Sequence, residues 1–415
     1  MIEPDVCILG AGPGGVAAAL QLDRLGVDCL LIDKAVFPRD KVCGDAISGK
    51  TVWAFNRIDE AIFKEFRGLD EKKINCWGIS FIFSNGRDLS VPYKPNLSAL
   101  DLSVEKPVGY VSKRIAFDNF LVEQVKKSTH IQLLENVNYT DIREEADGIH
   151  LSGKDAEDIK AKVVIVANGA LSQVARKLGG LQIEKKHHCG AIRAYMKNVK
   201  GMNEYNFIEL HFLKEFMPGY LWIFPLPNGD ANVGAGMRSD LLGKKKVNLK
   251  AALDRLIKEH PRFKDRFAEA EYDGPVQGFP LPLGSKKRKI SGNRFLLVGD
   301  AASLIDPLTG EGIGNAATSG FLAARHVAEA LHQNEFSANT FKKYDAEVYK
   351  YLWKELQIST QLQRAFLYPW LVTLTSSIAL RNQRFTEIIT SMFTDVDVRK
   401  KLLSPAFYFR LLLNR

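Results

Sequence analysis

A glycine-rich turn near the N-terminus constrains the fold of this chain more than any other feature. Residues 5–9 form a short apolar run that leads into a GxGxxG pattern, and a helix is expected from Val16 onwards. In such a turn the first glycine permits a tight bend, the second lets a pyrophosphate approach the backbone, and the third lets helix and strand pack closely. The turn residues that we expect to bind a dinucleotide are Gly10, Gly12, Pro13, Gly14 and Gly15.

An acidic residue follows this turn where a dinucleotide-binding unit needs one. A second apolar run, residues 28–32, ends in Asp33, whose carboxylate can bind both ribose hydroxyls and would repel a 2′-phosphate. We include the adjacent Lys34 among the cofactor-binding residues. Strand, turn, helix, strand and acid together predict dinucleotide binding in an α/β protein; the alternative is a glycine-rich turn without a ligand.

A second motif lies far along the chain, after the apolar run at residues 294–298. It begins with a Gly-Asp pair and continues as a Gly/Pro-rich loop that opens a helix. An aspartate that closes a strand can accept hydrogen bonds from a sugar-like chain, and free N–H groups at a helix start attract an anion. One large flavin, FAD, touched by both motifs explains this layout better than a simple turn. The expected contacts of the Gly-Asp pair are Gly299 and Asp300, and the family resemblance described below adds Pro307, Gly310, Gly312 and Ile313.

Composition places the chain among soluble globular proteins. Its 415 residues are 46% hydrophobic and 25% charged, enough for two or three packed units. No apolar run reaches the ~18 residues that span a bilayer, and the first strand begins too early for a signal peptide, so we expect a cytoplasmic protein. Five cysteines without CxxC or zinc spacing indicate reduced thiols, and neither they nor His187–His188 suggest a metal site.

The net charge of +9 includes short basic clusters at residues 244–246, 286–289 and 399–401. No aromatic-rich nucleic-acid motif lies between them, so nucleic acid is not an expected partner. The clusters are either solvated surface or a face attracted to an anionic membrane, which would make the protein peripheral to the inner face of the membrane.

Only one complete dinucleotide fingerprint is present, because Gly179–Gly180 lacks a strand-turn-helix context. This argues against a reductase with two nucleotide domains. A nicotinamide donor, NAD(P)H, must therefore dock transiently, or the electrons come from a ferredoxin-like protein. The sequence leaves both open.

Aromatic residues alternate along an expected strand in the middle of the chain. Period-two spacing places Tyr220, Trp222 and Phe224 on one face, and a turn at residues 227–230 would bring back a partner strand. Glycines of that partner would leave a slot opposite the rings, which suits a long apolar substrate. The alternative is ordinary sheet core. The glycines in question are Gly234 and Gly236.

These segments resemble the geranylgeranyl reductase family, within the para-hydroxybenzoate-hydroxylase-like flavoproteins, over about residues 1–330. The family is similar in its Tyr-x-Trp-x-Phe-Pro element followed by Gly-x-Gly. The resemblance implies a Rossmann-like FAD-binding domain of the glutathione-reductase type, with Asp300 on the ribityl chain and residues 307–312 along the isoalloxazine ring. It also implies reduction of carbon–carbon double bonds in a geranylgeranyl-type lipid.

The resemblance extends to three shorter segments. Residues 37–48 resemble the loop and helix that reach the flavin in related proteins, which makes Cys43 an active-site thiol or merely a packed side chain. Arg114 lies in a similar Arg-x-x-Phe-Asp-x-x-Leu segment and either reaches FAD or forms a surface ion pair. Asn168 departs from the Asp-Gly that flavin hydroxylases carry. The implied cofactor contacts are Lys41, Cys43, Gly44, Arg114 and Gly169.

For the domains, we expect a discontinuous FAD-binding domain at residues 1–75, 106–182 and 276–330. An inserted α+β substrate domain would comprise residues 76–105 and 183–275, and residues 331–415 a C-terminal helical region. Within the latter, the apolar residues 366–374 either pack on the substrate domain or form a lipid-facing lip.

Reduced FAD would deliver a hydride to the alkene while a proton reaches the neighbouring carbon. The expected catalytic residues are Cys43, Tyr220 and Trp222, with Cys43, Tyr220 or a trapped water as the proton source. Two alternatives stay open: an FAD-dependent monooxygenase or halogenase, although the halogenase Trp-x-Trp-x-Ile-Pro element is absent, and a non-catalytic lipid-binding flavoprotein. The sequence leaves open whether the lipid is a phospholipid, a quinone or a free diphosphate.

Overall fold

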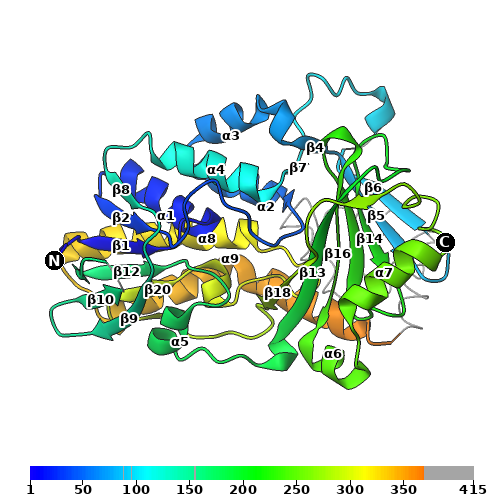
Figure 1. The fold of residues 1–415 in the computed structure, drawn as a ribbon. Helices are drawn as coiled ribbons and strands as arrows, with labels where there is room; N and C mark the ends of the chain where they lie inside the picture. Colours follow the sequence, from blue (N-terminus) through cyan, green and yellow to red (C-terminus); the bar gives the residue numbers. More distant parts are fainter. Residues whose placement is uncertain (87, 95, 154–155, 369–415) are drawn as a thin grey trace, which may run out of the picture.

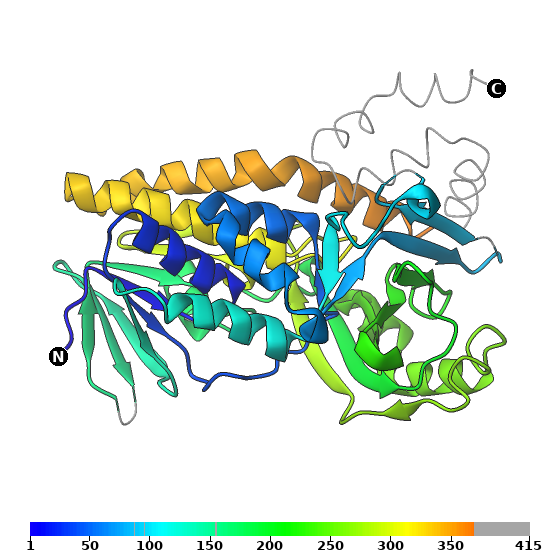
Figure 2. The ribbon, with the colours of Figure 1, turned by 90° about the horizontal axis from the view of Figure 1, so that it is seen from above.

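Two large β-sheets organise the part of the chain that the structure describes. This computed structural model describes residues 1–86, 88–94, 96–153 and 156–368. Figure 1 shows one sheet near the N-terminus and the other at the opposite end of the molecule. Figure 2 shows two long helices, α8 (Ile313–Gln333) and α9 (Ala338–Ala365), side by side along one flank. The architecture is the α/β fold that the sequence predicts.

The first sheet is Rossmann-like. Its strands follow the order β19-β20-β12-β1-β2-β8, and all neighbours are parallel except β19 and β20. Every residue of the four central strands is buried, which explains why they read as unbroken apolar runs in the sequence. The strands are β1 (Val6–Leu9), β2 (Cys29–Ile32), β8 (Ile131–Leu134), β12 (Val163–Val166), β19 (Ser291–Gly292) and β20 (Phe295–Leu297).

The two motifs of the sequence meet where α1 crosses α8. A Cβ atom on Gly320 would lie 2.1 Å from the carbonyl oxygen of Gly14, so the helix after the first motif packs directly on the helix after the second. In the turn itself, a Cβ on Gly15 would lie 1.8 Å from the carbonyl oxygen of Gly10, so only glycine fits there. The helices of this half are α1 (Pro13–Arg24), α2 (Gly49–Ile58), α3 (Glu60–Arg67), α4 (Arg114–Val125) and α5 (Gln173–Gly179).

Two small sheets accompany the first sheet. One is an antiparallel meander, and the other carries β3, β7 and β4 in that order. Their strands are β9 (Tyr139–Glu144), β10 (Ile149–Gly153) and β11 (Ile159–Ala161), and β3 (Ala46–Ile47), β4 (Ile74–Cys76) and β7 (Gly109–Val111). Short 3₁₀ helices are η1 (Asp70–Lys72), η2 (Leu97–Ala99), η3 (Lys185–His187), η4 (Pro227–Gly229) and η5 (Gly299–Ala302).

The second sheet has eight strands, in the order β17-β13-β16-β15-β14-β5-β6 with β18 also paired to β13. Only the β14–β5 pairing is parallel among these. Its elements are β5 (Gly78–Phe83), β6 (Asp88–Pro92), β13 (His188–Lys197), β14 (Ile208–Phe212), β15 (Tyr220–Pro225), β16 (Ala231–Arg238), β17 (Glu271–Tyr272) and β18 (Gln277–Pro282), with α6 (Ser239–Lys245) and α7 (Leu249–Glu259).

The two faces of β15 pack into different cores, as the alternation of its residues predicts. Trp222 and Phe224 belong to one hydrophobic cluster, whereas Leu221 and Ile223 belong to another that includes residues of α7. The expected turn between β15 and β16 is also present as η4. The face of β15 that carries Trp222 and Phe224 therefore points to the space between the two sheets, away from α7.

Two expectations need adjustment at the edges of these units. Residues 277–282, which we placed with the FAD-binding domain, form β18 and pair with β13 of the second sheet, because the chain continues along that edge before it returns. We therefore propose that the boundary lies after Pro282. Helix α9 lies within the expected helical region, 331–415, whereas α8 lies mainly in the segment that we assigned to the FAD-binding domain. Residues 369–415, which include most of the apolar segment 366–374, lie outside the described residues. At its start, Phe366 packs edge-on against Phe212 of β14, with ring centroids 5.1 Å apart.

Among the described residues, no helix combines the length and the apolar composition that crossing a membrane requires.

Candidate active site

A cavity of about 650 Å³ extends from the turn after β1 to the aromatic face of β15. Residues from both motifs and from the second sheet share its wall. The sequence-predicted residues that line it are Gly10, Gly12, Pro13, Gly14, Asp33, Lys34, Lys41, Cys43, Gly44, Arg114, Gly169, Tyr220, Trp222, Phe224, Gly299, Asp300, Gly310, Gly312 and Ile313.

Four expected site residues do not line this cavity. Gly15 packs against Gly10 behind the turn, and Pro307 is buried with its carbonyl oxygen bonded by Gln363. Substrate contact by Gly234 and Gly236 stays a prediction, although neither glycine lines the cavity. A Cβ on Gly234 would lie 2.1 Å from the Trp222 ring, so the slot that this glycine leaves is filled by the protein's own indole.

At the nucleotide end, Asp33 holds the glycine turn in place. Its carboxylate accepts hydrogen bonds from the backbone N–H of Ala11 at 2.8 Å and of Ala35 at 2.9 Å. The side chain is only 8% exposed. Each carboxylate oxygen has a second lone pair, so the position that the sequence predicts for ribose recognition keeps acceptor capacity.

Two arginines share one buried carboxylate beside the turn. Arg114 binds Asp118 through two hydrogen bonds of 2.7 Å, and Arg39 binds the same carboxylate at 2.6 Å. Burial acts against the charge on Asp118, but the two arginines hold the pKa of this carboxyl below its usual value. Arg114 is 3% exposed, so the surface ion pair that we considered is wrong: the pair is buried at the cavity wall. The Arg39 guanidinium also reaches the cavity, where it can meet an anion.

Arg39 is a site residue that sequence reasoning missed. Its guanidinium is the nearest group to the place where a Cβ on Gly12 would stand, at 3.8 Å. It lines the cavity and packs over the Phe37 ring. The residues next to Arg39 in the sequence do not predict its role, because its partner Asp118 is far away in the chain.

The Gly-Asp motif faces the loop of residues 37–48 across the cavity. Lys41 lies 3.4 Å from a carboxylate oxygen of Asp300 and over the ring of Phe279. In the following loop, Asp306 accepts hydrogen bonds from the N–H groups of Leu308 and Thr309 and fixes the turn. The motif residues therefore form one surface with residues from the other end of the chain.

The aromatic wall uses its own polar hydrogens. Trp222 donates its indole N–H to Asn232 at 2.8 Å, and Tyr220 donates its hydroxyl to the carbonyl oxygen of Thr309. Burial raises the pKa of Tyr220. A hydroxyl whose proton is already bound and whose pKa is raised is a poor proton donor, so this geometry favours a positioning role for Tyr220.

Cys43 stands at the junction of this wall with the loop of residues 37–48. The thiol is half-buried, and the carbonyl oxygen of Cys43 accepts a hydrogen bond from Asn232. Gly44 lies flat against the wall: a Cβ there would meet the Phe224 ring at 3.0 Å. Asp45 follows in a left-handed conformation with φ of +67° and is completely buried.

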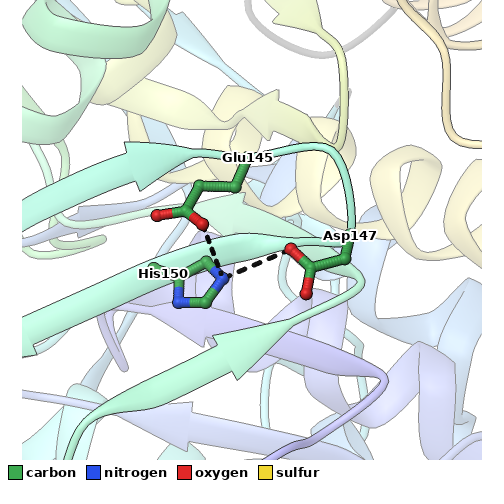
Figure 3. Close-up of side chains that lie close together, drawn as sticks. All are labelled: Glu145, Asp147 and His150. Carbon is green, nitrogen blue, oxygen red and sulfur yellow. Dashed lines mark hydrogen bonds and ion pairs between the residues drawn. The ribbon is translucent and has the colours of Figure 1, made fainter.

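A group compatible with a metal lies elsewhere, on the β9–β10 hairpin. Figure 3 shows Glu145 and Asp147 around His150, with the His150 Nε2 atom 3.5 and 3.4 Å from their oxygens. Lys160 already pairs with Asp147 at 2.8 Å, and this lysine together with His150 lowers the pKa of Asp147 to about 2. Both carboxylates are exposed and Asp147 already pairs with a lysine, so the group reads as a surface charge network.

The strand–turn–helix, the Gly-Asp loop and the single cavity that joins them define an FAD-dependent oxidoreductase. Two family models match the chain: the pyridine nucleotide-disulphide oxidoreductase model over residues 4–205 and the geranylgeranyl reductase catalytic domain over residues 188–272.

Curated relatives cover most of the chain. The digeranylgeranylglycerophospholipid reductase of Methanocella arvoryzae is 30% identical over 368 residues, which are 85% of each chain. The menaquinone reductase of Mycobacterium tuberculosis is 27% identical over 409 residues, 95% of this chain and 92% of its own. The chain therefore belongs to the geranylgeranyl reductase family.

Solved structures agree on the fold. A geranylgeranyl bacteriochlorophyll reductase-like protein from Thermoplasma acidophilum superimposes with a TM-score of 0.81 at 23% identity and covers 100% of this chain and 98% of its own. The flavin-dependent brominase Bmp2 gives 0.74 at 19% identity and covers 99% and 98%. At these identities the likeness concerns the fold alone.

Proposed function

We propose that this protein reduces carbon–carbon double bonds in the prenyl chain of a lipid, with electrons from FAD held in the cavity. The observation that carries the proposal is the apolar lining of the cavity beside the aromatic wall. It comes from four strands of the second sheet, β5, β14, β15 and β18, and includes Ile79, Ile208, Leu210, Trp222 and Leu281. Menaquinone and digeranylgeranylglycerophospholipid, the substrates in the relatives' names, both bear polyprenyl chains, which such a lining suits.

The residues at the other end fit FAD. A Cβ on Gly169 would meet nothing within 4 Å, and one on Gly12 only the Arg39 guanidinium, so backbone is open to a ligand at both places. Asp33 keeps acceptor capacity for a ribose, and the Arg39 guanidinium beside Gly12 suits a pyrophosphate. We propose that Lys41 and Asp300 order the ribityl chain. When bound, FAD supplies the two electrons as a hydride.

The chain's own side chains shape the reaction. An isolated alkene is a poor hydride acceptor, so a proton must arrive as the hydride does, in a site without bulk water. Tyr220 and Trp222 present ring surfaces to the cavity while their polar hydrogens bind Thr309 and Asn232. Cys43 at the edge of the wall is then the side chain that we assign to proton delivery.

The test uses the FAD-loaded protein, reduced anaerobically with dithionite so that the physiological donor, NAD(P)H or a ferredoxin-like protein, is not needed. A geranylgeranyl lipid should reoxidise the flavin, and the product should gain two hydrogens per double bond by mass spectrometry. The same lipid with a saturated chain is the control and should leave the flavin reduced. Turnover only with oxygen, giving a hydroxylated or halogenated product, would instead support the monooxygenase or halogenase alternative.

A further inference from the structure

One buried carboxyl group in the wall of the cavity takes no part in the function proposed above. Asp45 has an exposed fraction of 0% although its neighbours in the loop are half-buried. Its Oδ2 atom accepts a hydrogen bond from the Asn232 side chain at 2.8 Å, and its Oδ1 atom accepts one from the backbone N–H of Arg114 at 3.3 Å. It thus ties the loop to strand β16 and to the start of α4.

Asn232 carries this connection to the aromatic wall. The same amide nitrogen also donates to the carbonyl oxygen of Cys43 at 2.8 Å, and the amide oxygen accepts the indole N–H of Trp222 at 2.8 Å. Because the indole N–H is only a donor, it fixes which end of the amide faces Trp222. One side chain therefore holds Asp45, Cys43 and Trp222 in a single arrangement.

The two bonds to Asp45 are strongest when the carboxylate is ionised. The Asn232 amide and the Arg114 backbone N–H are both donors, so neither can accept a proton from a neutral carboxyl group. Of the neighbouring groups that can accept one, the Tyr195 hydroxyl lies beside the carboxyl. Protonation of Asp45 therefore removes the charge that strengthens both bonds and draws the carboxyl towards Tyr195.

The charged groups around Asp45 come from three elements. Burial disfavours the carboxylate and raises the pKa of Asp45 to about 6. The hydrogen bond from Asn232 and the positive charges of Arg193 and Arg114 lower this pKa but do not offset the effect of burial. Arg193 on β13 is itself bound to Asp40 at 2.6 Å and lies 4.0 Å from the centre of the Tyr195 ring. Asp45 is therefore poised to change charge in the range where cells work.

We propose that Asp45 is a positioning residue whose carboxylate, through Asn232, holds Cys43 and the Trp222 indole at the reacting edge of the cavity, and whose protonation releases both. The proposal rests on the proposed function only in taking this cavity as the reaction site. Asp45 is not proposed as the proton donor to the substrate, because its carboxyl group has no exposed surface.

The first experiment follows the Trp222 indole in the FAD-loaded protein labelled with 5-fluorotryptophan. The fluorine resonance of Trp222 is assigned by its absence in Trp222→Phe and is followed from pH ~5 to ~7.5, a window around the Asp45 pKa. It should shift with a midpoint near 6. In Asp45→Asn the shift with pH should disappear, and the resonance should sit near the low-pH position of the wild type, because an amide can satisfy only one of the two donors.

Asparagine is the sharp replacement because it tolerates the left-handed backbone of this position. The matched control is Asp345→Asn, a half-buried carboxyl that also accepts a backbone hydrogen bond, from Ile290 at 3.1 Å, but does not line the cavity. It should leave the Trp222 titration unchanged. The same midpoint in Asp45→Asn as in the wild type would overturn the proposal. A wild-type resonance that does not shift with pH would also overturn it, and this second measurement does not depend on whether the Asp45 variant folds.

The second experiment measures single-turnover reoxidation of the reduced flavin by a geranylgeranyl lipid. The wild-type rate should fall as the pH drops through about 6, and Asp45→Asn should be slower by roughly tenfold with no such dependence, a cost typical of small misplacements. Wild-type-like rates and pH dependence in Asp45→Asn would contradict the proposal. If the lipid does not react at all, the proposed function fails while the fluorine titration still decides the role of Asp45.

Discussion

The hydroxyl of Tyr220 donates a hydrogen bond to the carbonyl oxygen of Thr309, which joins the aromatic strand of the second sheet to the loop of the Gly-Asp motif. A Cβ on Gly310 would lie 3.1 Å from the same hydroxyl, so loop and ring are in close contact. The two halves of the cavity are thereby held in register by a bond between residues that no sequence pattern relates.

Tyr220→Phe should therefore weaken positioning and leave chemistry intact. Removing one hydrogen bond should lower the free energy of unfolding by about 1 kcal/mol, and turnover should fall several-fold rather than vanish. Calorimetry and single-turnover kinetics measure the two effects. Tyr272→Phe is the control, since Tyr272 also donates to a single acceptor, Asp254, but lies outside the cavity. Loss of activity by orders of magnitude would mean that Tyr220 is the proton donor after all.

Gly234→Ala should be strongly destabilising. The added methyl group would lie 2.1 Å from the Trp222 ring and 2.3 Å from the carbonyl oxygen of Ile192, so either the indole or the strand must move. We expect a loss of about 2 kcal/mol or more in the free energy of unfolding. Gly236→Ala on the same strand is the matched control, because its methyl group would meet Ala191 at an ordinary 3.4 Å. Equal melting temperatures for the two variants would show that the packing between Gly234 and the Trp222 ring is looser than these distances indicate.

Local patterns were enough to predict the strands of the first sheet, the glycine turn and the alternating faces of β15, because each depends on residues close in sequence. The partners of buried polar groups could not be predicted in this way. Asp45 binds Asn232, and Arg39 binds Asp118, across long stretches of chain. Gly234 shows the same limit, since the space above a glycine in a strand gives no sign of whether a ligand or the protein's own side chain fills it.

Arg39→Ala should weaken FAD binding while the protein stays folded. The change removes the cation next to Gly12 but leaves the two hydrogen bonds between Arg114 and Asp118, so the buried carboxylate stays paired. We expect an increase in the FAD dissociation constant of roughly tenfold, the value of one charge-assisted bond to a phosphate. Fluorescence titration of the apoprotein with FAD measures it. Arg143→Ala, at an exposed ion pair outside the cavity, should bind FAD as the wild type does.

Asp45 should also make stability depend on pH in an unusual direction. Its pKa is raised from 3.8 to about 6 in the folded protein, mainly by burial, so the folded state binds this proton more tightly than the unfolded chain does. The contribution to stability is then complete below about 3.8 and is lost as the pH rises through about 6. Asp45→Asn carries no charge at any pH and lacks this dependence.

The free energy of unfolding of the wild type minus that of Asp45→Asn should therefore fall between pH ~4 and ~6.5, by up to about 3 kcal/mol, and stay level above. Urea titrations of both proteins at several pH values measure the difference, in which the other titrating groups largely cancel. A difference that rises with pH over this window would mean that the carboxylate is stabilised by Asn232, Arg114 and Arg193 more than burial disfavours it. In that case Asp45 would stay ionised at every pH where the protein is folded, and the aromatic wall would be fixed rather than released by protons.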